Sequence, residues 1–155
     1  MTPLVSNLWP QFMVDPAFAA CFGQVIVEHA QMLRQERQVI FTLRSGAPLD
    51  KDLCARLLAS LQPDYEGFEL RIQNLFGYAM LDETALRGLM DEMKRDGVPI
   101  NGFLDRCTIQ IVGQKITIGV CHGTKFLQEM HFEKLLAERI AAHTGVTPQV
   151  TLQSA

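Results

Sequence analysis

The chain has 155 residues, of which 48% are hydrophobic and 20% charged, with a formal net charge of −3 at pH 7. Such a composition excludes extensive disorder, and the length gives room for one core or two small ones. Neither half is basic enough to predict nucleic-acid binding from net charge, because six basic and eight acidic residues precede position 81, and eight basic and nine acidic residues follow.

The first half predicts a helical lead-in, two strands, a helix and a third strand. Residues 1–14 hold large apolar side chains and two prolines without a clear period, which favours a short helix or coil. Asp15-Pro16 supplies an N-cap and a preset first helical residue for a helix that Gly23 ends. Asp50 caps a second helix, which continues to Leu61. Alternating apolar residues predict strands at 25–30, 39–43 and 68–73.

The second half begins with a helix capped by Asp82, and Asn101 can cap one short helical turn through Leu104. Alternating isoleucine and valine residues in 108–120 then predict a β-hairpin. Gly113 suits the first central position of its type II′ turn, where φ is positive. The buried stripe of the first helix consists of Leu86, Leu89, Met90 and Met93.

The segment after the hairpin predicts two consecutive helices and a closing strand at 148–152. Its two apolar groups lie about 140° apart around a helix, so one straight helix could not bury both. A break is therefore expected between Met130 and Phe132. The two groups are Phe126, Leu127 and Met130, and then Phe132, Leu135, Leu136 and Ile140. On the second helix, Glu133, Lys134, Glu138 and Ala141 are expected to be exposed.

These elements predict an α+β protein with two small lobes. Residues 1–78 form a ββαβ module with its helical lead-in, and residues 79–155 read α-α-β-β-α-α-β. The order of elements in residues 79–155 is similar to that of a type II KH domain. KH domains clamp nucleic acid with a Gly-x-x-Gly loop between two helices. The corresponding break at 129–132 contains no glycine, which favours a protein-binding platform over nucleic-acid binding.

Candidate catalytic and metal-binding residues are sparse. Zinc accepts cysteine and histidine ligands but normally needs closely spaced pairs. The scattered set Cys107, Cys121, His122 and His131 lacks that spacing. Asp91-Glu92 and Glu36-Arg37 are interpreted as solvated charges. No nucleophile elbow, phosphate-binding loop or dinucleotide fingerprint is present, so we assign no catalytic, cofactor-binding or metal-binding residue.

The cysteines and the N-terminal sequence favour the cytoplasm. Four scattered cysteines among apolar residues, Cys21, Cys54, Cys107 and Cys121, are typical of buried free thiols in a reducing compartment. The first twenty residues lack lysine and arginine, and prolines interrupt their apolar runs, which argues against a signal peptide. No apolar stretch is long enough to span a bilayer, so we expect no membrane insertion.

Over nearly its whole length the chain resembles the N-terminal region of the PolC-type DNA polymerase III alpha subunit of low-GC Gram-positive bacteria. Residues 24–74 are similar to the leading module of that family. The helix from Asp82, the hairpin 108–121 and the segment 132–152 are similar to its next module, which is itself similar to the polymerase-binding domain of the clamp-loader tau subunit.

This resemblance implies a noncatalytic protein-interaction region in DNA replication, with a clamp-loader or primosome subunit as partner. It also implies a longer parent protein with DNA polymerase and 3′–5′ exonuclease domains beyond Ala155. A KH-like nucleic-acid-binding module is the alternative, and a small enzyme using the cysteines and histidines is a weaker third hypothesis.

Overall fold

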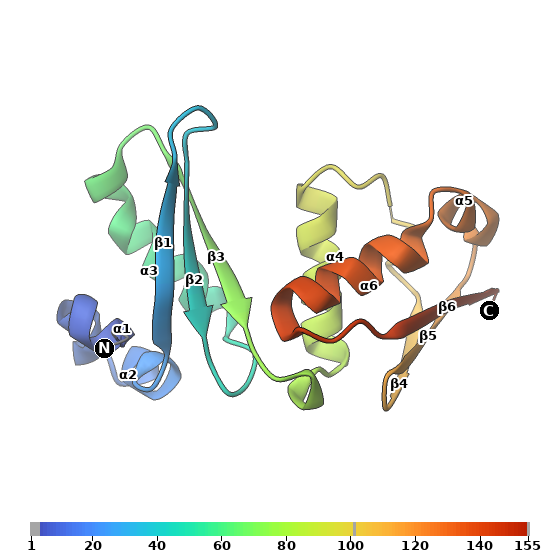
Figure 1. Ribbon diagram of the computed structural model, residues 1–155, viewed down its shortest axis with the longest axis horizontal. Helices are drawn as coiled ribbons and strands as arrows, with labels where there is room; N and C mark the ends of the chain where they lie inside the picture. The colour runs from blue at the N-terminus through green and yellow to red at the C-terminus, as the bar shows by residue number, and fades with distance from the viewer. Residues whose placement is uncertain (1–3, 101, 155) are drawn as a thin grey trace. The chain divides into compact units, whose positions relative to one another are not determined.

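The computed structural model describes residues 4–100 and 102–154, and it confirms an α+β protein. The chain divides into two compact units, Met1–Met80 and Leu81–Ala155 (Figure 1). This division lies two residues beyond the boundary expected from the sequence. Each unit contains one three-stranded sheet.

The first unit opens with three short helical segments, α1 (Val5–Leu8), η1 (Pro10–Val14) and α2 (Pro16–Phe22). Strands β1 (Ile26–Leu33) and β2 (Gln38–Arg44) form an antiparallel hairpin whose turn is the polar run 34–37. Helix α3 (Lys51–Leu61) and η2 (Gln62–Tyr65) lead into β3 (Glu69–Leu75), which pairs parallel to β2. A short η3 (Tyr78–Met80) ends the unit.

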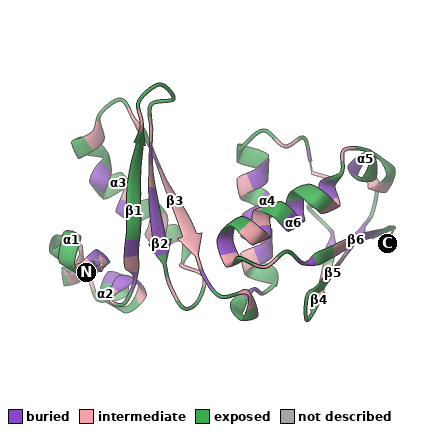
Figure 2. Cartoon of the chain, in the orientation of Figure 1, coloured by how far each residue is buried: buried purple, intermediate pink, exposed green. Residues whose placement is uncertain are grey.

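Alternation along β2 builds the core of the first unit. Val39, Phe41 and Leu43 are at most 3% exposed, and the ring of Phe41 meets Trp9 and Tyr65 edge-on. In contrast, Figure 2 shows that β1 is exposed along most of its length. The helical segments and η2 therefore cover one face of the sheet through these β2 side chains.

One side chain joins the loop before α3 to the sheet. Asn74 accepts a hydrogen bond from the Leu49 backbone N–H at 2.9 Å, and its amide nitrogen donates to the Leu43 carbonyl at 3.3 Å and the Ser45 hydroxyl at 2.9 Å. Asn74 thereby fixes the crossover between the parallel strands β2 and β3.

The second unit has the same sheet topology as the first. Helix α4 (Glu83–Arg95) precedes the antiparallel hairpin of β4 (Thr108–Val112) and β5 (Lys115–Val120). Helices α5 (Thr124–Glu129) and α6 (Phe132–Thr144) then lead to β6 (Gln149–Ser154), which is parallel to β5. The predicted type II′ turn agrees with the φ of +58° at Gly113, because Gln114 has no positive φ.

The break between α5 and α6 is confirmed. His131 adopts a left-handed conformation with φ of 59° and ψ of 42°, which redirects the chain and lets Leu127 and Phe132 both reach 0% exposure. Phe126 remains 42% exposed, so only part of the first apolar group is buried.

The prediction of a short helix after α4 was wrong for the described residues 102–104. Its cap, Asn101, lies outside the described residues, and 102–106 form turns instead. Gly102 has a φ of +82°, and the backbone makes four-residue β-turns, such as the one closed by the Asp105 N–H donating to the Gly102 carbonyl at 3.2 Å. Gly102 directly follows the expected cap, and its positive φ prevents a helix from continuing there. The described order is therefore α-β-β-α-α-β.

The predicted buried face of α6 was partly wrong. Phe132, Leu136 and Ile140 are fully buried as expected, but Leu135 is 36% exposed. Glu133 and Ala141 are only half-buried, whereas Lys134 and Glu138 are exposed as predicted. The stripe runs instead through Ala137 and His143, because α6 packs against α4 as well as the sheet.

None of the helices among the described residues has the length and apolar character needed to cross a membrane.

Candidate partner-binding surface

The helical lead-in of the first unit exposes apolar side chains with almost no charge. Asp15 is the single charged residue in the first 27 positions. Two large side chains of this stretch are unusually accessible, Leu8 at 47% and Val14 at 85% exposure. Apolar surface of this kind on a folded domain marks interaction sites more often than scattered apolar residues do.

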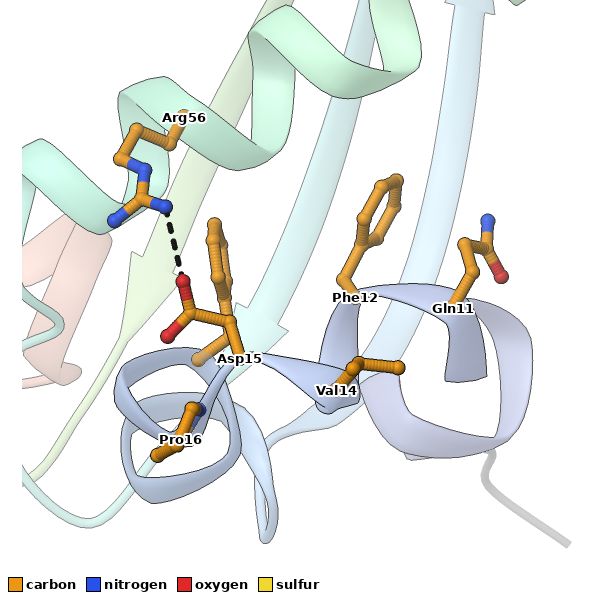
Figure 3. A pocket seen from close by; sticks show the side chains of 7 residues that line it. Gln11, Phe12, Val14, Asp15, Pro16 and Arg56 are labelled. Atoms are coloured by element: carbon orange, nitrogen blue, oxygen red, sulfur yellow. Dashed lines mark hydrogen bonds and ion pairs between the residues drawn. The ribbon is translucent and has the colours of Figure 1, made fainter.

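A shallow hollow of about 490 Å³ lies in this surface (Figure 3). It forms where the chain turns from η1 into α2, because the Asp15 carboxylate accepts the Ala17 backbone N–H at 2.9 Å and caps α2. The hollow is lined by Gln11, Phe12, Val14, Asp15, Pro16, Phe18 and Arg56. Two of these residues, Phe12 and Phe18, form its aromatic floor, and their ring centroids lie 6.3 Å apart.

One ion pair forms the polar edge of the hollow. Arg56 reaches from α3 and donates a hydrogen bond to the Asp15 carboxylate at 3.1 Å, as Figure 3 shows. Its guanidinium also lies 4.8 Å from the centroid of the Phe18 ring, a cation–π arrangement. The backbone N–H of Ala17, followed by Arg56, lowers the pKa of Asp15. Asp15 therefore remains a carboxylate at neutral pH.

The chemistry of the hollow suits binding. Its described lining consists of apolar side chains, one amide and one paired carboxylate–guanidinium group. A carboxylate held ionised by its neighbours is a weak proton acceptor, and none of the described side chains that line the hollow offers a thiol, imidazole or amine as a nucleophile. The arrangement can accommodate an apolar side chain of a partner protein.

The cysteines and histidines considered from the sequence lie in different settings. Cys107 is buried, and Arg87 donates to its carbonyl at 2.7 Å. His122 packs edge-on against Phe103 at 5.5 Å, and His131 forms the helix break. Cys121, just past the end of β5, is exposed, and Cys21 and Cys54 are half-buried, so the expectation of burial was correct only for Cys107. Within 4–100 and 102–154, no group of three or more potential ligands is arranged to hold a metal.

Burial lowers the reactivity of the less exposed thiols at neutral pH. Desolvation raises the pKa of Cys54 to about 12 and raises the pKa of Cys107 even though Arg87 lies beside it. Both groups therefore stay protonated at neutral pH, and a thiol is a much weaker nucleophile than a thiolate.

A polar cluster between α4 and α6 was missed by the sequence interpretation, which placed Glu92 in solvent. The Glu92 side chain is 17% exposed, and its carboxylate lies 3.0 Å from His143 Nε2 and 3.5 Å from Arg139. Arg139 also pairs with Asp96 at 2.7 Å. The sequence signal for this cluster was a spacing of four residues within each helix, between Glu92 and Asp96 and between Arg139 and His143. This spacing places both members of each pair on one face of their helix.

The environment of Glu92 predicts that the second unit loses stability in acid. Burial by itself would raise its pKa, but the hydrogen bond with His143 and the charges of His143 and Arg139 lower it below the ordinary value of 4.5. The stability that Glu92 contributes is therefore present above about pH 4.5 and is lost as pH falls through the lower folded-state pKa.

We expect Glu92→Gln to flatten the dependence of the free energy of unfolding on pH below about 4.5, because glutamine does not titrate. Urea denaturation at a series of pH values measures this slope. Glu138→Gln, on the exposed side of α6, serves as the control and should retain the wild-type slope. An unchanged slope in Glu92→Gln would show that Glu92 has the same pKa in both states.

Comparison with known proteins adds no relative. No protein-family model, curated protein or solved structure matches the chain.

Proposed function

We propose that this chain is a noncatalytic protein-interaction region of a replicative DNA polymerase, similar to the N-terminal region of the PolC-type alpha subunit. It acts in the cytoplasm, and its partner is a clamp-loader or primosome subunit. In this proposal, the parent protein carries the polymerase and exonuclease activities in other domains.

The apolar surface around the hollow supports a protein partner most directly. Exposing Val14 and Leu8 to water costs free energy that a partner with a matching apolar surface would recover, at about 25 cal/mol per Å² of area removed from water. Arg56 and Asp15 at the edge are already paired with each other. They can therefore remain hydrogen-bonded at the rim of an interface while the apolar floor is covered.

Two features of the second unit weigh against a nucleic-acid partner. A phosphate backbone approaches a KH domain at a glycine-containing loop between two helices, whereas the turn here is Met130-His131 with exposed Glu129 before it. Two arginines of this unit, Arg87 and Arg139, are engaged with acidic side chains. This leaves fewer cations to release counterions from a nucleic acid.

The order α-β-β-α-α-β in the second unit favours one alternative, a KH-like nucleic-acid-binding module. Such a module would bind single-stranded nucleic acid with a strong salt dependence. The two functions therefore differ in a property that titration measures.

The test is to titrate the chain with clamp-loader and primosome subunits, and separately with labelled single-stranded and duplex DNA and RNA, at low and physiological salt. We expect one protein subunit to bind with weak salt dependence. Val14→Asp should weaken that binding about tenfold or more, because it places a charge in an apolar interface. Val14 is 85% exposed, so the substitution should leave the fold intact.

Met32→Asp is the matched control, since Met32 is a 44% exposed apolar residue of β1 that does not line the hollow. It should leave the affinity for the protein subunit unchanged. Submicromolar nucleic-acid binding that falls steeply with salt, together with no protein partner, would favour the alternative and overturn the proposal.

A further inference from the structure

Strand β4 is an edge strand that lacks the features by which proteins usually protect sheet edges. Among the strands that the structure describes it pairs only with β5, in the order β4-β5-β6, and its sequence, Thr-Ile-Gln-Ile-Val, contains no charge and no proline. Its pairing with β5 runs without a bulge. Charged side chains, prolines and bulges are the common protections against edge-to-edge pairing.

The outer edge of the first sheet is protected, in contrast. Strand β1 has a register irregularity between Val27 and His29, and Glu28 at that point pairs with Arg44. Leu4 also forms an antiparallel bridge with Ile26, which occupies one end of the edge. The β1 edge is therefore protected, whereas the β4 edge is not.

Hairpin geometry identifies the backbone groups that face outward. Val112 and Lys115 flank a two-residue turn, so they form the first hydrogen-bonded pair of the ladder, and the pairs alternate from there. The N–H and C=O groups of Gln110 consequently point toward β5, and those of Ile109 and Ile111 point away. Among the described residues, none outside the hairpin bonds to these outward groups.

The side chains along this edge are also incompletely covered. Ile109 and Ile111 lie on the helix-facing side of the sheet but are only half-buried, while Ile116 and Ile118 opposite them are at 0% exposure. Val112 is 63% exposed. A further strand at this edge would reduce the exposure of all three side chains.

We propose that β4 pairs antiparallel with β4 of a second copy of the chain, about a two-fold axis at Gln110. The outward groups are symmetric about that axis, so Ile109 of one copy faces Ile111 of the other, and each such pair exchanges both N–H···O bonds. The isoleucines of both copies cluster on the helix-facing side. Because one patch serves both copies, the interface is isologous and closes as a dimer. This inference is independent of the proposed replication function.

Charge substitution at Gln110 tests this geometry, because the two Gln110 residues lie directly opposite each other. Gln110→Lys and Gln110→Glu each place like charges there and should each weaken self-association by about fivefold. An equimolar mixture of the two should recover association, because the charges then attract. Sedimentation velocity over a range of concentrations measures the dimer fraction of wild type, of each variant and of the mixture.

Ile111→Pro provides a second variant. It removes an outward N–H without removing a bond of the β4–β5 ladder, so the hairpin should persist by circular dichroism while dimerisation is lost. Gln149→Lys, on the outer strand β6, is the control and should associate like wild type. The proposal is overturned if wild type stays monomeric at every concentration, if mixing fails to restore association, or if Gln149→Lys is the variant that weakens it.

Discussion

Replacing Phe22 with alanine is expected to lower the free energy of unfolding of the first unit by roughly 3–5 kcal/mol. Phe22 is 0% exposed at the end of α2, and its ring stacks on Phe18 at a centroid distance of 5.7 Å. Alanine would leave a cavity beneath the residue that forms the aromatic floor of the hollow. Domains are stable by only about 0.05–0.15 kcal/mol per residue, so this loss is a large part of the total.

Urea denaturation followed by tryptophan fluorescence measures the effect of Phe22→Ala. Trp9 is the only tryptophan in the chain, and it packs on Phe41 within the same core at 5.6 Å. Its emission therefore reports on the first unit. Val14→Ala is the control and should change stability by less than about 0.5 kcal/mol, because Val14 is largely exposed. Equal midpoints for the two variants would contradict the packing described for α2.

The second large effect is expected at Leu136 on α6. Leu136→Ala should destabilise the second unit by about 2–5 kcal/mol through lost burial and a cavity, since Leu136 is 0% exposed. Leu135→Ala provides a control with the same chemical change one position earlier. Leu135 is 36% exposed, so its truncation should cost about 1 kcal/mol or less.

Amide hydrogen exchange at β5, β6 and α6 locates the Leu136 effect in the second unit. Exchange there should accelerate strongly in Leu136→Ala and little in Leu135→Ala, because global opening follows the lost stability. If Leu135→Ala proved the more damaging substitution, α6 would present a different face to its core.

The proposed protein partner and the proposed dimer use different surfaces of the chain. The hollow belongs to the lead-in and α3, whereas the open edge belongs to β4. Val14→Asp is therefore expected to affect partner binding without affecting self-association, and Gln110→Lys is expected to have the opposite effect. Measuring both properties in both variants separates the two proposals.

Local sequence signals determined most of the secondary structure. Alternating apolar residues predicted the strands β1 to β5, because side chains two residues apart share one face of a strand. Asp15, Asp50 and Asp82 each cap the helix expected from them, since a cap needs only the backbone N–H groups two or three residues ahead. The break before α6 followed from two apolar groups that one helix could not bury.

The tertiary structure decided the features that depend on residues distant in sequence. Asp15 and Arg56 are 41 positions apart, and Glu92 and His143 are 51 apart, so no local spacing connects them. The exposure of Leu135 and the burial of His143 depend on how α6 packs against α4. The open edge of β4 likewise depends on β6 pairing with the other side of β5. Sequence periodicity specifies which residues share a face, but only packing determines which element covers that face.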